Sequence, residues 1–196
     1  MLNIKHLFFN RNKEVKPVVC NPKIIFLDID GVIKPCASLK FRQHDYKNIG
    51  KELSKTYRKN YRRYAIEDLA LVLYDWDEQS IGCLRQIIER TGAGIVVTSS
   101  WKYHRLGLER MVDFFRLHGM ENNITDITPD LIGEEYSRYE SRIKEISAYL
   151  KDHPEIKNYV VVDDTDMKDA FKDHFLMTRH LLCKKDIAKA IEILEN

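Results

Sequence analysis

The sequence predicts an α/β protein in which helices cover both faces of a central parallel β-sheet. Short apolar runs typical of buried strands end abruptly in polar residues, and amphipathic helical segments lie between these runs. Because strand and helix alternate, we expect right-handed crossover connections, which produce a parallel sheet. A chain of 196 residues has the length of a single domain of this class.

Four segments are predicted strands, three of them continuously apolar and the last one weaker: 24–27, 95–97, 159–162 and 175–177. The residues that follow these strands directly are all polar: Asp28, Thr98, Asp163 and Thr178. The carboxyl ends of parallel strands meet at one edge of a sheet, so we expect these side chains to converge on one crevice.

Helical periodicity predicts four helices between and after these strands, at 78–91, 106–117, 139–150 and 184–194. About 45 residues separate Gly31 from the first of them, far more than an ordinary strand-to-helix loop contains. This length predicts a small helical cap inserted after the first strand, at about 33–77. Residues 1–22 are basic and irregular, and we expect an N-terminal extension there, ahead of a domain at 23–196.

Composition narrows the class of protein. The 32 basic and 30 acidic side chains give a net charge of +2, so only local clusters of charge are informative about partners. The four cysteines, Cys20, Cys36, Cys83 and Cys183, form no C-x-x-C pair, which argues against a zinc knuckle or a disulfide framework. Apolar runs are too short for a signal peptide or a membrane span, so we expect a cytoplasmic protein without a membrane partner. The sequence does not predict an oligomeric state.

Two pairs of aspartates stand at predicted strand ends: Asp28 with Asp30, and Asp163 with Asp164. Four carboxylates at one sheet edge would repel strongly, and a hard divalent cation is the commonest way to keep them ionised together. Mg²⁺ suits such a site because it takes few protein oxygens and leaves positions open for water and phosphate. Each aspartate could instead cap the following turn, but two pairs at matching strand ends favour a metal site.

Three segments resemble motifs I, II and IV of the haloacid dehalogenase (HAD) superfamily: F-L-D-I-D-G-V, V-V-T-S-S-W-K and V-V-V-D-D. The Ser-Ser-Trp-Lys ending of the second, together with Thr128-Pro129 and the segment R-I-K-E-I that begins at Arg142, is similar to the HAD domains of Swiss Army Knife RNA repair proteins. The resemblance covers about residues 23–195. It implies a Rossmann-like HAD fold with a cap and a catalytic domain that transfers phosphate.

The resemblance also implies roles for individual residues. Asp28 would be the nucleophile that forms an aspartyl-phosphate, and Asp30 would be the acid/base, with its main-chain carbonyl joining Asp28 in binding Mg²⁺. Asp163, with Asp164 beside it, would complete the metal site. Asp30 favours a phosphatase, since dehalogenases of the superfamily lack an acid at that position. A phosphomutase would use the same residues.

Further residues would contact the phosphoryl group. Thr98 and Ser99, at the end of the second motif, would bind it through hydrogen bonds. The third motif normally supplies a lysine or arginine that neutralises the crowded oxygens. Arg142 is the first candidate for that cation. Lys102 is the competing candidate and a second substrate-binding residue, although a lysine at that position could also be a solvated surface charge.

The predicted cap contains a basic, tyrosine-rich segment at 46–64. Its apolar residues recur at spacings of three and four, which predicts one helix face: Tyr46, Ile49, Leu53, Tyr57, Tyr61 and Tyr64. Basic side chains interleaved with tyrosines could bind single-stranded nucleic acid by tracking the backbone and stacking on bases. The more ordinary interpretation is that the tyrosines pack the helix onto the body while the basic face is solvated.

Taken together, the sequence predicts a Mg²⁺-dependent phosphatase that acts on a phosphorylated substrate, with a nucleic-acid end as the favoured one. A phosphatase of small metabolites or nucleotides is the alternative. A phosphate-receiving signalling domain also gathers aspartates on an α/β sheet, but it places the paired acids early and the accepting aspartate on a later strand. A noncatalytic nucleic-acid-binding module is disfavoured because all four acids are retained.

Overall fold

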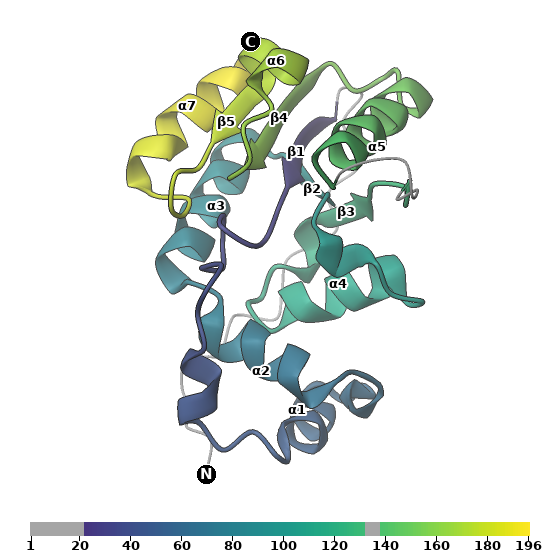
Figure 1. Ribbon diagram of the computed structural model, residues 1–196, viewed down its shortest axis with the longest axis vertical. Coiled ribbons are helices and arrows are strands. Elements are labelled where there is room, and N and C mark those ends of the chain that lie inside the picture. The colour runs from purple at the N-terminus through teal and green to yellow at the C-terminus, as the bar shows by residue number, and fades with distance from the viewer. Residues whose placement is uncertain (1–21, 132–137) are drawn as a thin grey trace.

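The central sheet contains five strands, all parallel, in the order β3-β2-β1-β4-β5 (Figure 1). This computed structural model describes residues 22–131 and 138–196. The strands are β1 (Lys23–Leu27), β2 (Gly94–Val97), β3 (Ile124–Ile127), β4 (Asn158–Asp163) and β5 (Phe175–Met177). The chain runs outward from β1 to β3 and then returns to place β4 on the other side of β1. The strand order therefore reverses between β1 and β4, where open α/β sheets bind their ligands.

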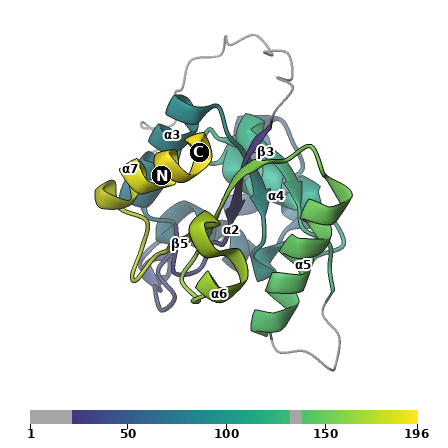
Figure 2. The same ribbon diagram turned by 90° about the horizontal axis from the view of Figure 1, so that it is seen from above.

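Helices cover both faces of the sheet, as predicted. Alternate residues of β1 enter two separate cores, because side chains of a strand point to opposite faces in turn. Ile25 and Leu27 pack with α3 (Glu78–Thr91), α4 (Gly107–Arg116) and α7 (Lys184–Glu195). Ile24 and Phe26 pack with α5 (Arg138–Asp152) and α6 (Lys168–Phe171). Figure 2 shows α3 and α7 on the side of the sheet opposite α5.

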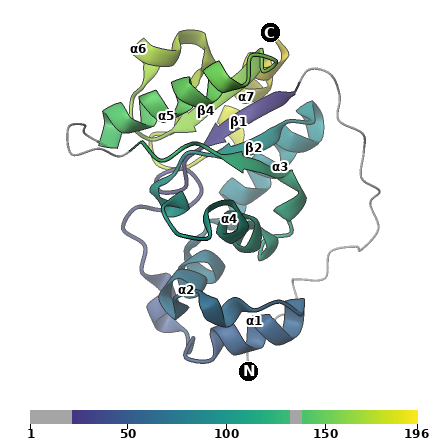
Figure 3. The ribbon, with the colours of Figure 1, turned by 90° about the vertical axis from the view of Figure 1, so that its right-hand side faces the viewer.

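The segment predicted as a cap contains α1 (Ile49–Tyr57), α2 (Ile66–Asp75) and two short 3₁₀ turns, Lys40–Gln43 and Tyr61–Arg63. Figure 3 shows α1 and α2 together at one end of the molecule, beyond α4. In Figure 1 the carboxyl ends of β1 and β4 point toward this end. The predicted boundaries of a separate cap, about 33–77, stay a prediction.

The prediction of one helix through the tyrosines is wrong on both sides of α1, because Tyr46 lies before the helix and Tyr61 and Tyr64 lie after its end at Tyr57. The helix α1 ends there because Arg58 adopts a left-handed conformation, with φ of 53°. Tyr61 and Tyr64 follow in the 3₁₀ turn and its cap, and both are almost completely buried. The packing interpretation of these two tyrosines is therefore confirmed.

The buried carboxylate of Asp113 fastens this segment to α4. It accepts hydrogen bonds from Tyr64 Oη at 2.8 Å, Arg63 Nη2 at 2.9 Å and Lys59 Nζ at 2.5 Å. Tyr61 Oη donates to the main-chain oxygen of Asp113 at 3.1 Å. Two of the basic residues of the segment, Lys59 and Arg63, thus have a structural role. Five others are exposed: Lys47, Lys51, Lys55, Arg58 and Arg62.

The four predicted strands and the four predicted helices outside the cap are confirmed, with ends that differ by a residue or two. The strand β3 was not predicted. The predicted N-terminal extension, residues 1–22, lies outside the described residues except for Pro22. Within the described part of the chain, no helix has both the length and the apolar composition needed to cross a bilayer.

Candidate active site

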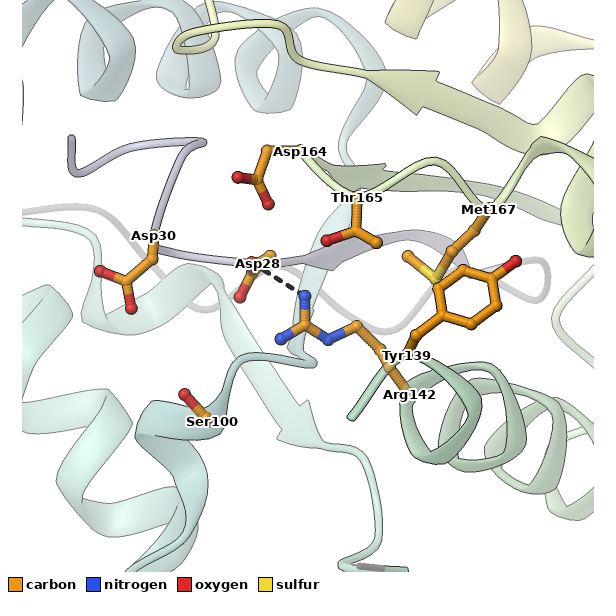
Figure 4. Close-up of a pocket in the computed structure, with 8 residues that line it drawn as sticks. All are labelled: Asp28, Asp30, Ser100, Tyr139, Arg142, Asp164, Thr165 and Met167. Carbon is orange, nitrogen blue, oxygen red and sulfur yellow. Dashed lines mark hydrogen bonds and ion pairs between the residues drawn. The ribbon is translucent and has the colours of Figure 1, made fainter. Parts of the chain in front are cut away.

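A cavity of about 360 Å³ opens at the carboxyl ends of β1 and β4, at the point where the strand order reverses (Figure 4). Its lining combines acids, one arginine and several neutral side chains: Asp28, Asp30, Ser100, Tyr139, Arg142, Asp164, Thr165 and Met167. These residues come from four separate parts of the sequence. The fold brings them together because β1, β2 and β4 are neighbours in the sheet and α5 covers one of its faces.

Sheet hydrogen bonding continues one residue past each strand end and fixes the polar residues there. Asp28 N donates to Val162 O at 3.0 Å, and Thr98 N donates to Leu27 O at 2.9 Å. Asp163 is the last residue of β4. Asp28, Thr98 and Asp163 therefore lie at one edge of the sheet, as does Thr178, whose N donates to Asp163 O at 2.9 Å. Of these four predicted residues, only Asp28 lines the cavity.

Three carboxylates form the acidic centre of the site. Asp28, Asp163 and Asp164 each offer an oxygen, and these oxygens all lie within 4.8 Å of one another. Asp28 and Asp163 are almost completely buried. Burial raises the pKa of both carboxyls, and for Asp163 the neighbouring charge of Asp28 adds to this effect and raises the pKa to about 7. The ionised cluster therefore requires a positive charge beside it.

Arg142 supplies one such charge. Its Nη1 donates to Asp28 Oδ2 at 2.9 Å and to Asp163 Oδ2 at 2.6 Å (Figure 4 draws the first of these bonds). Burial opposes the charge of the guanidinium, but the two carboxylates outweigh it and raise the pKa of Arg142 above its usual value. Arg142 thus stays protonated and connects the acids of β1 and β4 across the crevice.

Gly31 allows Asp164 to reach this centre. It follows Asp30 in a tight turn, in which the amides of Val32 and Lys34 both donate to Ile29 O, and its φ of +77° is one that residues with a side chain rarely adopt. A Cβ at Gly31 would lie 2.3 Å from Asp164 Oδ2. A glycine is therefore required both by the turn and by the carboxylate that lies against it.

The residues fit a hard divalent cation. The three candidate side-chain ligands all offer carboxylate oxygens, which such ions prefer. Asp28 Oδ1 is buried and has no hydrogen-bond partner among the residues that the structure describes. A buried carboxylate oxygen in this situation is costly unless a ligand completes its coordination. A cation at the meeting point of Asp28, Asp163 and Asp164 would remove that cost.

The family of the chain is shown by a match to the model of the HAD domain in Swiss Army Knife RNA repair proteins, which covers residues 24–183. The chain belongs to this HAD family. Neither a curated protein nor a solved structure matches it. The superfamily and the fold expected from the motifs are confirmed, and the family supports a hydrolase of the phosphatase kind. HAD domains generally use a divalent metal ion, in keeping with the acidic centre found here.

In this HAD domain, Thr98 and Ser99 lie directly after β2 and are almost completely buried. Thr98 Oγ1 is buried and has no hydrogen-bond partner within the described residues. The Ser99 hydroxyl also makes no well-formed hydrogen bond within the described residues. It lies close enough to Asp28 to oppose the rise in the pKa of the Asp28 carboxyl. Neither residue is among those that line the cavity, which this segment reaches through Ser100. The predicted contact of Thr98 and Ser99 to a phosphoryl group stays a prediction.

Asp30 lies on the same cavity but does not join the acidic centre. Its side chain is 37% exposed, and it forms an ion pair with Lys34, with Nζ 2.6 Å from Oδ1. Its other oxygen, Oδ2, accepts a hydrogen bond from Trp101 Nε1 at 2.7 Å. Asp30 is thus separate from the acidic centre and is held by two donors of its own.

Lys102 is not among the residues that line the cavity of the HAD domain. Its ammonium group is buried and forms an ion pair with Glu145 of α5, whose other carboxylate oxygen accepts a hydrogen bond from Tyr103 Oη at 2.7 Å. Burial lowers the pKa of Lys102, and the charge of Glu145 opposes this change. The structure therefore brings Arg142, and not Lys102, to the carboxylates of Asp28 and Asp163.

Four residues of the cavity were not singled out from the sequence: Ser100, Tyr139, Thr165 and Met167. Ser100 and Thr165 directly follow predicted site residues, so their neighbourhood in the sequence was a usable signal. Tyr139 lies three residues before Arg142, which places it on the same face of α5. Met167 carried no signal, because a buried methionine is ordinary in a core.

Proposed function

We propose that this HAD domain is a Mg²⁺-dependent phosphomonoester hydrolase that acts through an aspartyl-phosphate on Asp28. The observation that carries the proposal is the arrangement of Arg142, which bridges the buried carboxylates of Asp28 and Asp163. Arg142 places fixed positive charge where a transferring phosphoryl group would add negative charge. Asp28, Asp163, Asp164 and the main-chain carbonyl of Asp30 would hold Mg²⁺, which neutralises phosphoryl oxygens and aligns the group with its nucleophile when bound.

The proposed reaction has two steps. In the first, a carboxylate oxygen of Asp28 bonds to phosphorus, the bond from phosphorus to the leaving oxygen breaks, and Asp30 gives its proton to that oxygen. In the second, Asp30 takes a proton from water as the water oxygen attacks phosphorus. The aspartyl-phosphate bond then breaks, so Asp28 is restored and inorganic phosphate leaves. Thr98 and Ser99 would hold the phosphoryl oxygens during both steps.

The favoured substrate is a phosphate at a nucleic-acid end. A cavity of about 360 Å³ falls in the range of pockets that hold whole small ligands, so it has room for part of the substrate beyond phosphate. Tyr139, at its rim, is 39% exposed and offers a ring on which a base could stack. The matched family consists of domains in RNA repair proteins. We further propose that single-stranded nucleic acid contacts the exposed basic residues of segment 46–64.

Two other functions are distinguished by experiment. A phosphatase of nucleotides or small metabolites would use the same acidic centre and would not need the basic residues of α1. A noncatalytic phosphate-receiving or nucleic-acid-binding module would keep ligand binding without turnover.

We propose a cytoplasmic location because Cys36, Cys83 and Cys183 are free thiols, as is usual in a reducing compartment.

The first test is phosphate release from matched oligonucleotides that carry a 3′ or a 5′ phosphate, beside nucleotides and p-nitrophenyl phosphate. The Asp28→Asn variant should lose turnover, and EDTA should abolish it until Mg²⁺ is restored. Turnover that survives in Asp28→Asn would refute the covalent mechanism. A preference for small esters would identify the alternative, a metabolite or nucleotide phosphatase.

The second test concerns the basic residues and avoids Lys59 and Arg63, because those two hold the fold together through Asp113. The test variant replaces four exposed cations of the α1 region by alanine: Lys51, Lys55, Arg58 and Arg62. The control variant removes the same charge elsewhere: Lys157, Lys184, Lys185 and Lys189. The test variant alone should raise KM for oligonucleotides, with a smaller salt dependence, and leave p-nitrophenyl phosphate unaffected. Equal effects of both variants would exclude this binding surface.

A further inference from the structure

The side chain of Asp30 is held at both of its oxygens. Lys34 Nζ lies 2.6 Å from Oδ1, and Trp101 Nε1 donates to Oδ2 over 2.7 Å. An ionised carboxylate has about four lone-pair sites, so these two donors leave about two available. The two donors fix the plane of the carboxylate. Because Asp30 lines the cavity, the remaining lone-pair sites can still exchange a proton there.

Trp101 is itself rigidly supported. Its main-chain oxygen accepts a hydrogen bond from Arg110 Nη1 at 2.7 Å, and Arg110 forms an ion pair with Asp68 at 2.6 Å. The indole also packs edge-to-face against Trp76 and Phe114, with ring centroids 6.2 and 6.0 Å away. Packing alone explains the ring, but it does not explain why the single N–H of the indole meets the carboxylate of the proposed acid.

Lys34 is unusual because its side chain is only 7% exposed. Lysines are almost never buried to this degree without a partner. Its position is set by the tight turn, in which its amide donates to Ile29 O at 3.0 Å and its carbonyl accepts from Gly31 N at 2.7 Å. The ammonium group is thereby held over Asp30, with Pro35 O as a second acceptor at 3.1 Å.

We propose that Trp101 and Lys34 are positioning residues that fix the Asp30 carboxyl group for proton transfer to the leaving oxygen. This inference rests on the proposed function, in which Asp30 is the acid/base. A general acid contributes only when its proton lies within hydrogen-bond reach of the atom that receives it. A carboxyl group free to rotate would meet that condition for a fraction of the time. The two donors remove this freedom.

The test uses Trp101→Phe, which keeps most of the aromatic packing and removes the N–H. The value of kcat/KM is measured over a series of phosphate esters whose leaving groups differ in acidity. Poor leaving groups, such as those of alkyl phosphates, depend on protonation, whereas p-nitrophenolate hardly needs it. Trp101→Phe should lower kcat/KM roughly tenfold for the alkyl ester and less than about twofold for p-nitrophenyl phosphate. A tenfold loss is only part of what a positioned general acid contributes, because the acid itself is still present in the variant.

Lys34 gives a second, independent variant. Lys34→Met should show the same dependence on the leaving group, and Lys34→Arg, which keeps a cationic donor, should restore most of the activity on the alkyl ester. In an Asp30→Asn background neither Trp101→Phe nor Lys34→Met should change this dependence further, because the group that they position is gone. These results together would support the inference.

A uniform loss over the whole ester series, or an equal loss in the Asp30→Asn background, would overturn the inference and leave Trp101 and Lys34 as packing residues. Failure of the proposed function would look different. In that case the unmodified protein would release no phosphate, or Asp28→Asn would release as much as the unmodified protein.

Discussion

In the absence of a divalent cation, Asp163→Asn should raise the free energy of unfolding at pH 8 and leave it nearly unchanged at pH 4. The reason lies in the acidic centre. Burial, together with the nearby charge of Asp28, raises the pKa of Asp163 to about 7 in the folded protein. The ordinary pKa of this carboxyl, expected in the unfolded chain, is 3.8. Asparagine has nearly the same shape and does not titrate.

The sign and size of the effect follow from proton binding. Between about pH 4 and pH 7 the folded protein keeps the proton on Asp163, while the unfolded chain has lost it. The free energy of unfolding therefore falls as the pH rises through this window, by at most about 1.4 kcal/mol for each pH unit. Over the whole window the loss reaches at most about 4 kcal/mol. In Asp163→Asn this loss does not occur, because asparagine binds no proton in this pH range.

The assay is urea unfolding in EDTA at several values between pH 4 and pH 8, for the unmodified protein and for Asp163→Asn. The difference between the two proteins cancels the contributions of titrating groups that do not interact with Asp163, and it retains the effect of Asp28, whose charge acts on Asp163. It should grow with pH and level off above pH 7. A difference that stays constant from pH 4 to pH 8 would refute the reasoning. Mg²⁺ at a hundred times its Kd should return about 2.7 kcal/mol to the unmodified protein at pH 8, and less to the variant.

Two further predictions concern glycine and a buried ion pair. Gly31→Ala and Gly92→Ala both force a side chain into a left-handed conformation and should each cost about 1–2 kcal/mol of stability. Only Gly31→Ala should also weaken Mg²⁺ binding in calorimetric titration, because its Cβ meets Asp164 while a Cβ at Gly92 meets nothing within 4 Å. Lys102→Met should cost about 3–5 kcal/mol in urea unfolding, since Glu145 is left buried without its cation. A second change, Glu145→Leu, should recover most of this loss, and a failure to recover it would contradict the ion-pair explanation.

The central strands could be predicted from the sequence because their apolar runs have no polar interruption, as burial on both faces requires. The edge strand β3 could not. Of its four residues only Ile124 is buried, and Thr125 and Asp126 interrupt any apolar pattern. An edge strand needs only one partner and can be partly solvated, so the hydrophobic signal that reveals the other strands is missing.

The acids of the candidate site could be predicted because their positions follow from strand ends alone. The orientation of other side chains could not. Lys102 stands in the second motif, but its side chain turns toward Glu145, which lies more than forty residues away in the sequence. The hydrogen bond from Trp101 to Asp30 likewise joins two motifs that only the folded chain brings together. The end of α1 at Arg58 carried no glycine or proline to announce it.

The central place of β1 has a consequence for how the protein is made. Ile25 pairs with Ile95 on one side and with Val160 on the other. The second partner is synthesised about 135 residues later, which at roughly 5–20 residues per second means on the order of ten seconds. During that time β1 presents an apolar edge without its neighbour. Folding thus depends on contacts between distant parts of the chain, which form slowly and expose strands to aggregation. The carboxylates that follow β1 and end β4 come together only when these two strands pair.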